Sequence, residues 1–406
     1  MSQEKVVVTG INVISALGLN IDENWERMLK GESGVSRIRL FDPSGLDTRI
    51  AAQLPEAFEE YSKKYVKKRV AKQMTRVSRM CLTAAKEAVE HHQIPLDEFD
   101  AERCAVVLGV VNTGNSSVEK GTNERNRILK GMNNALSAWI SLEFGLEGPN
   151  YAIATACASS AYAIAAAYDL IKTGKADFVL AGGADSAINP EEIEGFNALY
   201  AISTRNDAPE QASRPFSADR DGFVIGEGAG IIMLESERHA RKRGAKIYAE
   251  LAGYALTSEA FNIMSPKTDG LGMARTMEKA LADAGIKPEE VDYINAHGTS
   301  TTLNDLYETK AIQKVFGAHA ENLCVNSTKS MIGHTIGAAG AIEAAVTVKS
   351  IEQQRLHPTI NLVHPDPELP LDYVANTLRK REIRVALSNS FAFGGHNASL
   401  VFKRYK

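Results

Sequence analysis

The sequence predicts an α/β fold built from two similar halves. One observation is a set of short runs rich in Val, Ile and Ala, with the length and composition of buried strands: 5–10, 104–111, 176–184, 230–236, 247–256, 291–298 and 385–395. The other is the presence of helical stretches between them, such as 76–92 and 272–285. Strands that alternate with helices indicate a mostly parallel sheet covered on both faces.

The order of these elements occurs twice along the chain. Each half gives a strand, an amphipathic helix, a strand ending near a reactive residue, a helix of small residues, and a strand with two adjacent glycines. We expect one half at residues 1–246, with insertions, and the other at residues 247–406. Because pockets commonly form where two units meet, we expect the functional site at their junction.

Composition excludes several classes of protein. The 46 basic and 50 acidic residues give a net charge of −4, which argues against bulk nucleic-acid binding. The four cysteines are far apart, with no CxxC and no histidine spacing suited to zinc, so we expect no metal site and a reducing compartment. The N-terminus enters a strand-like run at once, and the most apolar long segment, 152–171, carries too many polar residues to span a membrane. The sequence therefore predicts a cytoplasmic protein.

Cys157 lies in "ATACASSAYA" (154–163), where a strand or loop gives way to a helix of small residues. A free cysteine is most often a small buried hydrophobe. The alternative is a nucleophile at a helix N-terminus, where unpaired N–H groups and the positive end of the helix dipole favour the thiolate. Cys157 alone does not decide between these interpretations.

Three further motifs have the residue types of a working site. "NAHGTSTTLNDLYE" (295–308) contains His297 after a strand, "NSTKSMIGHTIGAAGA" (326–341) contains His334 before a small-residue helix, and "NSFAFGG" (389–395) is a strand broken by phenylalanine and two glycines. Taken singly, each histidine is more often structural than functional.

Together the motifs resemble one family. "TACASS", "SRPFSADRDGFVIGEGAG", "NAHGTSTTLND", "KSMIGHTIGAAG" and "NSFAFGG" are similar, in order and over essentially the whole chain, to the type II elongating β-ketoacyl-acyl-carrier-protein (ACP) synthases. The resemblance implies a thiolase-like fold with two duplicated halves in a five-layered αβαβα arrangement. It also implies a Cys-His-His set at Cys157, His297 and His334. Relatives with Cys-His-Asn or Cys-His-Cys sets fit less well.

This resemblance implies a decarboxylative Claisen condensation between an acyl chain on the cysteine and malonyl-ACP. Cys157 would be the nucleophile, and the backbone N–H groups of Cys157 and Phe393 would form the oxyanion hole. His297 and His334 would stabilise the enolate that forms when malonyl loses CO₂.

The supporting residues are also implied by resemblance. Lys329 and Glu308 would fix the histidine environment, and Thr299 and Thr301 would hydrogen-bond the pantetheine arm. Phe393 would act as the gate of the acyl chamber. No cofactor of its own is expected, because the phosphopantetheine arm is carried by the ACP.

The expected partners are the ACP and a second ketosynthase chain. The basic segment 63–80, with Lys67, Lys68 and Arg69, and the more distant Arg205 would form the docking rim for the acidic ACP. The second chain would complete either a homodimer or a heterodimer with a cysteine-less chain-length subunit.

Several positions depart from the family pattern, and the largest departure leaves the substrate open. Aligning the loop 109–117 on Gly109 places Asn112 where the family usually has an isoleucine that lines the acyl pocket. A polar side chain there favours a polyketide or polyene chain over a saturated fatty acyl chain. Two other functions remain as alternatives: a non-catalytic chain-length subunit, although such subunits lack the cysteine, and a CoA-dependent thiolase, although the second cysteine is missing.

Overall fold

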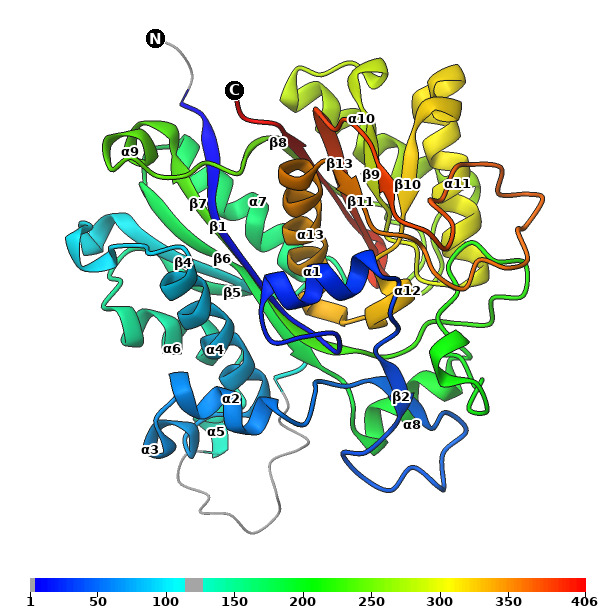
Figure 1. The fold of residues 1–406 in the computed structure, drawn as a ribbon, viewed down its shortest axis with the longest axis horizontal. Coiled ribbons are helices and arrows are strands. Elements are labelled where there is room, and N and C mark those ends of the chain that lie inside the picture. Colours follow the sequence, from blue (N-terminus) through cyan, green and yellow to red (C-terminus); the bar gives the residue numbers. More distant parts are fainter. Residues whose placement is uncertain (1–3, 114–126) are drawn as a thin grey trace.

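The computed structural model describes residues 4–113 and 127–406, and its centre is one ten-stranded mixed sheet (Figure 1). The first half contributes β1 (Val6–Ile14), β4 (Cys104–Gly109), β5 (Asn150–Ile153), β6 (Phe178–Ser186) and β7 (Glu227–Ser236). The second half contributes β8 (Ala249–Ser258), β9 (Tyr293–Asn295), β10 (Cys324–Asn326), β13 (Val385–Ala392) and β14 (His396–Lys403). The strand order is β10-β9-β13-β14-β8-β1-β7-β6-β4-β5.

The two halves of the sheet have the same topology. In the first half, β4 pairs in parallel with β5 and β6, and β7 is antiparallel to both β6 and β1. In the second half, β9 pairs in parallel with β10 and β13, and β14 is antiparallel to both β13 and β8. β1 and β8 join the halves, with residues 6–8 opposite residues 249–251. The predicted duplication is confirmed, while the exact boundary at residue 246 stays a prediction.

Helices form the other layers. α4 (Arg76–His91) and α6 (Ala135–Phe144) pack on the outer face of the first half-sheet, and α10 (Leu271–Ala284) and α11 (Thr302–Phe316) lie on the outer side of the second half (Figure 1). Between the half-sheets lie α7 (Ser159–Lys172), against β4 and β6, and α13 (Ala339–Gln353), against β7 and β13. This is the five-layered thiolase-like arrangement that the resemblance implied.

The remaining elements are short and mostly peripheral. The helices among them are α1 (Ile21–Leu29), α2 (Phe58–Tyr65), α3 (Lys68–Ala71), α5 (Arg127–Lys130), α8 (Pro190–Ala198), α9 (Glu237–Lys242) and α12 (Lys329–Ile332). Two small two-stranded sheets pair β2 (Val35–Arg37) with β3 (Ile50–Ala52), and β11 (Arg355–Leu356) with β12 (Arg379–Lys380). Within the two described stretches of chain, no helix is both long enough and apolar enough to cross a bilayer.

Small residues allow the middle layer to pack closely. A Cβ at Gly340 of α13 would lie 2.8 Å from the backbone nitrogen of Ala161 in α7, so the two central helices almost touch there. A Cβ at Gly109, the last residue of β4, would lie 2.2 Å from the nitrogen of Ser160, so the first turn of α7 rests directly on the sheet. Cys157 lies two residues before the start of that turn.

All seven predicted strands are present, but the sheet is mixed rather than mostly parallel. The β7 and β14 strands run against their neighbours on both sides. A run of buried apolar residues shows that both faces are covered, and carries no information on strand direction. The sequence analysis missed three strands of this sheet. β5 and β10 are only four and three residues long, and the eight-residue β14 follows β13 after the short turn 393–395.

Candidate active site

Cys157 lies in a tight turn between β5 and α7. The preceding residue, Ala156, has a φ of 49°, an uncommon conformation for a residue with a side chain. Ser159 fixes this turn: its hydroxyl accepts a hydrogen bond from the Thr155 nitrogen (2.8 Å) and donates one to the Ala156 carbonyl (2.7 Å). Cys157 is 5% exposed and lies two residues before Ser159, the first residue of α7. The structure therefore gives this thiol one fixed position, rather than a place in an apolar core.

The structure brings Cys157, His297 and His334 together. The Cys157 sulfur and a ring nitrogen of each histidine all lie within 4.8 Å of one another. The two imidazole rings are 5.4 Å apart between centroids and nearly perpendicular, at 84°. All three residues line one cavity of about 280 Å³. His297 comes from the loop after β9, and His334 from the segment between α12 and α13, so the trio combines both halves of the chain.

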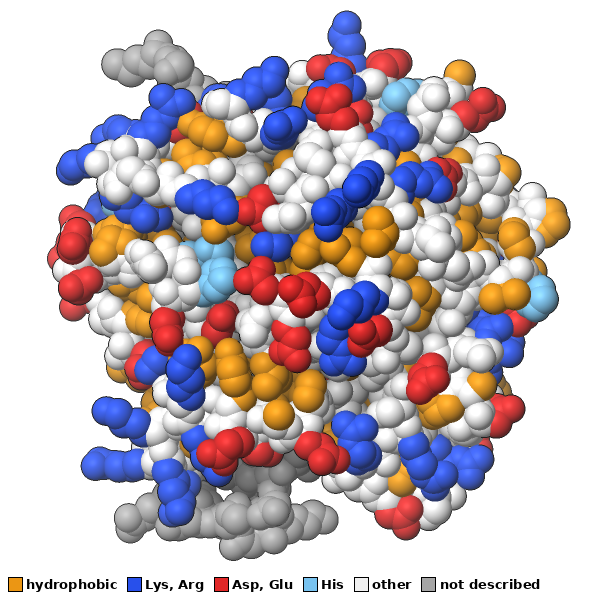
Figure 2. Space-filling view, in the orientation of Figure 1, with side chains coloured by type: hydrophobic (Ala, Val, Ile, Leu, Met, Phe, Trp, Pro, Cys, Tyr) orange, Lys and Arg blue, Asp and Glu red, His pale blue; other side chains and the backbone are white. Residues whose placement is uncertain are grey.

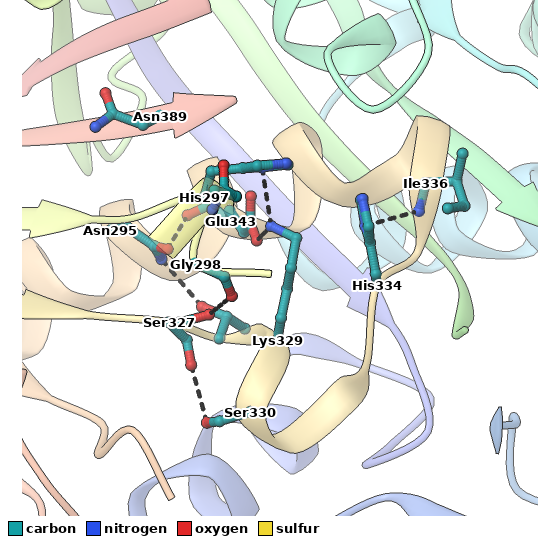
Figure 3. Close-up of polar contacts among 12 residues, drawn as sticks. Asn295, His297, Gly298, Ser327, Lys329, Ser330, His334, Ile336, Glu343 and Asn389 are labelled. Carbon is teal, nitrogen blue, oxygen red and sulfur yellow. Dashed lines mark hydrogen bonds and ion pairs between the residues drawn. The ribbon is translucent and has the colours of Figure 1, made fainter. Parts of the chain in front are cut away.

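Hydrogen bonds define the tautomer of each histidine (Figure 3). The Lys329 ammonium lies 3.3 Å from His297 Nδ1, and because an ammonium can only donate, Nδ1 is the acceptor. The Ile336 N–H donates to His334 Nδ1 at 3.3 Å. Each ring must then carry its proton on Nε2. His334 Nε2 is buried without a hydrogen-bond partner among the described residues, so its N–H is available to donate to a substrate atom in the cavity.

Lys329 pairs with an acid that the sequence analysis missed. Its ammonium forms a buried ion pair with Glu343 of α13, and both side chains are only 2% exposed. Glu308, the expected partner, instead accepts hydrogen bonds from the backbone nitrogens of His297 and Gly298, each at 2.8 Å. Glu308 thus positions the loop that carries His297. Glu343 could have been found as the single acid within a long run of small and apolar residues, 336–348.

Burial governs the protonation of the trio. Burial raises the pKa of the Cys157 thiol to about 12, although Lys329 opposes this change. Burial, together with the positive charge of Lys329, lowers the pKa of both His297 and His334 well below its usual range. At neutral pH the resting site therefore holds a thiol and two neutral imidazoles. The thiolate that the sequence analysis considered for a helix N-terminus is therefore not the resting form, because burial outweighs the effect of Lys329.

The expected substrate-binding residues surround the same cavity. Thr299 and Thr301 line it, and their hydroxyl oxygens are 2.8 Å apart and hydrogen-bonded. Phe393 also lines it and precedes two glycines with φ of 80° and 71°, so the chain turns sharply there. The Gly394 nitrogen donates to the Ile263 carbonyl (2.7 Å), which connects this turn to the loop 259–266.

The mouth of the cavity contains an exposed aromatic residue that the sequence analysis missed. Tyr200 is 92% exposed and has a φ of 53°, and its side chain borders both the catalytic cavity and a second, more polar cavity. A bulky residue in this backbone conformation is rare, and such strain is concentrated at functional sites. An exposed tyrosine gave no signal in the sequence.

Two groups of predicted residues lie away from the cavity lining. Asn112 is absent from the lining residues, and its side-chain nitrogen donates to Glu192 Oε1 at 2.8 Å. The rest of its loop, from residue 114, lies outside the described residues. Lys67, Lys68 and Arg69 are exposed on and just before α3. Arg205, by contrast, lies 3.4 Å from Asp219 and 3.5 Å from Asp221, so its charge is matched within the protein.

The site has two sets of atoms that could hold a metal ion. Cys157, His297 and His334 offer sulfur and nitrogen ligands of the kind that zinc prefers. Nearby, Asn295 Oδ1 and Glu343 Oε2 are buried oxygens without a hydrogen-bond partner in the described structure, a donor type that suits a hard cation or a water molecule. The Lys329 ammonium between these groups disfavours a divalent ion.

Comparison with known proteins agrees with this geometry. The family model described as "Beta-ketoacyl synthase, N-terminal domain" matches residues 3–240, and the one described as "Beta-ketoacyl synthase, C-terminal domain" matches residues 248–363. The chain belongs to the β-ketoacyl synthase family. It is an acyltransferase that forms carbon–carbon bonds, a condensing enzyme of fatty-acid or polyketide elongation.

Relatives are similar over their full length. A 3-oxoacyl-[acyl-carrier-protein] synthase 2 from Synechocystis sp. is 41% identical over 100% of this chain and 99% of its own, and one from Vibrio cholerae is 41% identical over 100% of both. Among solved structures, the complex of a type II polyketide ketosynthase with its acyl-carrier protein and a hexaketide matches with a TM-score of 0.90 and 33% identity over 100% of both chains. The ishigamide ketosynthase/chain length factor matches with a TM-score of 0.90 and 32% identity, also over 100% of both chains.

Replacing Lys329 by alanine should strongly destabilise the protein. The change leaves the Glu343 carboxylate buried without its partner, which typically costs about 3–5 kcal/mol in the free energy of unfolding. The double variant Lys329→Met/Glu343→Leu should recover most of this stability, because the uncompensated charge is gone, while remaining inactive. Urea denaturation provides the measurement. Lys63→Ala, which breaks the exposed pair with Glu60, is the control and should change stability by less than about 1 kcal/mol. Equal effects of Lys329→Ala and Lys63→Ala would contradict the assignment.

Proposed function

We propose that this condensing enzyme takes an acyl chain from a carrier onto Cys157 and joins it to malonyl-ACP, with His297 and His334 as the donors to the enolate. The observation that carries the proposal is the pair of Nε2–H groups beside one buried thiol. In each ring the proton is kept on Nε2 because Nδ1 of the same ring accepts a hydrogen bond. A single buried thiol would serve many reactions. Two neutral imidazole donors facing it suit a reaction in which negative charge develops on a thioester oxygen.

In the loading step, the sulfur of Cys157 attacks the carbonyl carbon of the acyl thioester. A new carbon–sulfur bond forms, the bond to the pantetheine sulfur breaks, and the proton of the Cys157 thiol ends on the departing pantetheine thiol. The backbone N–H groups of Cys157 and Phe393 would stabilise the tetrahedral oxyanion. The positive end of α7 and the Lys329 ammonium favour the thiolate as it forms, which offsets part of its desolvation.

In the condensation step, malonyl-ACP loses CO₂. The electron pair of the broken carbon–carbon bond moves onto the thioester oxygen as an enolate, where His297 and His334 donate their Nε2–H groups. The enolate carbon then attacks the acyl group on Cys157. Collapse of this intermediate forms the β-ketoacyl-ACP and releases the Cys157 sulfur as a thiolate, which takes one proton from solvent water. Neutral imidazoles suit this role, since they donate without giving up a proton.

We also propose the partners of the reaction. The pantetheine arm comes with the ACP, so the chain would need no cofactor or metal of its own, and it would act in the cytoplasm. The ketosynthase/chain length factor that it resembles supports a heterodimer with a cysteine-less subunit, and the 41%-identical synthases leave a homodimer equally open. Presence of Cys157 with both histidines favours a catalytic role for this chain over that of the cysteine-less partner.

The ACP would dock on the basic side chains around α3. In Figure 2, Lys and Arg side chains project at lower left, where Figure 1 places α3. Lys67, Lys68 and Arg69 are exposed there. Arg205 is the weaker candidate, because Asp219 and Asp221 already neutralise its charge.

Cys157→Ala should abolish acyl loading, whereas His297→Ala and His334→Ala should each slow malonyl decarboxylation by about 10²–10³-fold, because the enolate loses one of its two donors. Intact-mass analysis detects the acyl adduct, and CO₂ release from malonyl-ACP reports decarboxylation. His364→Ala, at an exposed position, is the control and should behave as wild type. An acyl adduct at the wild-type rate on Cys157→Ala, or normal CO₂ release by both histidine variants, would reject the proposal.

Reversing the charges of Lys67, Lys68 and Arg69 together should raise the KM for ACP-bound substrate and leave turnover of a small thioester mimic unchanged. Exposed rim charges act on docking and not on buried chemistry. The control is the same charge change at Lys279, Lys310 and Lys314, which are exposed on α10 and α11. If both triple variants behave alike, or if the small mimic is affected equally, docking does not involve α3.

The residue Asn112 should make the enzyme prefer an acyl chain with a carbonyl, hydroxyl or conjugated group. A matched hydrogen bond between this amide and the chain contributes about 0.5–1.5 kcal/mol, so the expected preference in kcat/KM is roughly 2- to 10-fold. Loading rates of octanoyl and of β-keto or dienoyl thioesters would measure it. Asn112→Ile should shift the preference to saturated chains, and Thr113→Val should not. The side-chain amide of Asn112 already donates to Glu192. If wild type loads octanoyl fastest, the amide does not act on the acyl chain and the prediction is wrong.

A further inference from the structure

One buried carboxylate near the site is held by the backbone rather than by a cation. Asp185 lies near the end of β6 and is completely buried. Its Oδ2 accepts hydrogen bonds from the Val111 nitrogen (2.8 Å) and the Gly337 nitrogen (3.1 Å), and the Asn112 nitrogen lies 3.3 Å from Oδ1 and 3.2 Å from Oδ2. The Ser186 N–H contributes a further bond. Burial raises the pKa of the Asp185 carboxyl to about 7, and the four backbone N–H groups oppose this change because they favour the ionised form. Above this pKa the carboxylate is held by hydrogen bonds without a counter-ion.

The surroundings of Asp185 fit it closely. A Cβ at Gly337 would lie 2.4 Å from Asp185 Oδ2 and 2.9 Å from the Val111 nitrogen, both shorter than real contacts allow. Glycine is therefore required where the segment after His334 approaches the carboxylate. The loop after β4 and the segment before α13, from different halves of the chain, thus meet on one side chain.

The second of these segments controls His334. Ile336, next to Gly337, has a φ of 46°, and its N–H is the donor to His334 Nδ1. A strained backbone conformation persists only where surrounding contacts hold it. The bond from Gly337 to Asp185 is such a contact. Its loss would release the turn and the hydrogen bond that keeps the His334 proton on Nε2.

We infer that Asp185 is a positioning residue of the condensation step: its carboxylate anchors the turn at Gly337 and so keeps the Nε2–H of His334 aimed at the enolate oxygen. The same carboxylate fixes the backbone of Val111 and Asn112, so the histidine and the loop after β4 share one anchor. The inference rests on the proposed function, because it assigns Asp185 to the decarboxylation that His334 supports.

The charge of Asp185 also acts on the nucleophile. Asp185 and Glu343 raise the pKa of the Cys157 thiol and Lys329 lowers it, while the two neighbouring imidazoles are neutral. Removing the negative charge of Asp185 therefore lowers the pKa of Cys157. The pH dependence of Cys157 alkylation reports this change, and a purely structural role would not predict its direction.

The test uses two variants of the full chain. Asp185→Asn keeps the shape but turns an amide N–H₂ toward backbone N–H donors. It should reduce the kcat of malonyl-ACP decarboxylation about 10- to 100-fold, as small displacements of catalytic groups do, without raising KM. Its alkylation curve with iodoacetamide should move to lower pH. Gly337→Ala should reduce decarboxylation similarly, because the new Cβ separates the turn from the carboxylate. It retains the charge, so its alkylation curve should show no comparable shift to lower pH.

Glu235→Gln is the matched control. Glu235 is a completely buried carboxylate opposite Phe178, at the other end of the β6–β7 pair from Asp185. This variant should decarboxylate and be alkylated like wild type. A loss equal to that of Asp185→Asn would show a general effect of removing a buried carboxylate and would overturn the inference.

The remaining outcomes separate the two proposals. If wild type releases CO₂ from malonyl-ACP and both Asp185→Asn and Gly337→Ala do so at the wild-type rate, the positioning role is wrong and the proposed function stands. If wild type itself releases no CO₂, the proposed function fails, and the role of Asp185 fails with it.

Discussion

The close contact of α7 and α13 between two half-sheets is the constraint on which the rest of the structure depends. The two helices approach so closely at Gly340 and Ala161 that only small residues fit. Each helix also has its N-terminal end at the junction of the halves. Cys157 precedes one of these ends and His334 lies a few residues before the other, so packing of the middle layer brings them together.

Desolvation then determines the chemistry of the site. A buried thiol and two buried imidazoles all favour their neutral forms. The neutral state is useful, because an imidazole fixed by a bond to Nδ1 presents a single N–H donor on Nε2. Two charged groups beside the trio, Lys329 and Glu343, are paired with each other. They lie beside the reacting groups, where they orient His297 and moderate the acidity of the thiol.

Backbone N–H groups held by buried carboxylates recur around the trio. Glu308 binds the nitrogens of His297 and Gly298, and Asp185 binds those of Val111 and Gly337. In both cases the carboxylate fixes a loop that carries or adjoins a histidine. This is an economical way to make irregular backbone rigid, since one side chain satisfies two or more buried N–H groups that have no partner in a helix or sheet.

The sequence by itself determined the duplication, seven of the ten strands of the central sheet, and the residues of the trio. These features are local runs or motifs, and the trio was assigned through its resemblance to a family. Tertiary structure alone decided strand direction, since a buried run reads the same either way. It also decided that Lys329 pairs with Glu343 and not Glu308, that Arg205 is neutralised by Asp219 and Asp221, and that Cys157 is a weak acid. Each of these properties depends on distances between residues remote in the sequence and on the exclusion of water. A local sequence pattern contains information on neither the distances nor the exclusion of water.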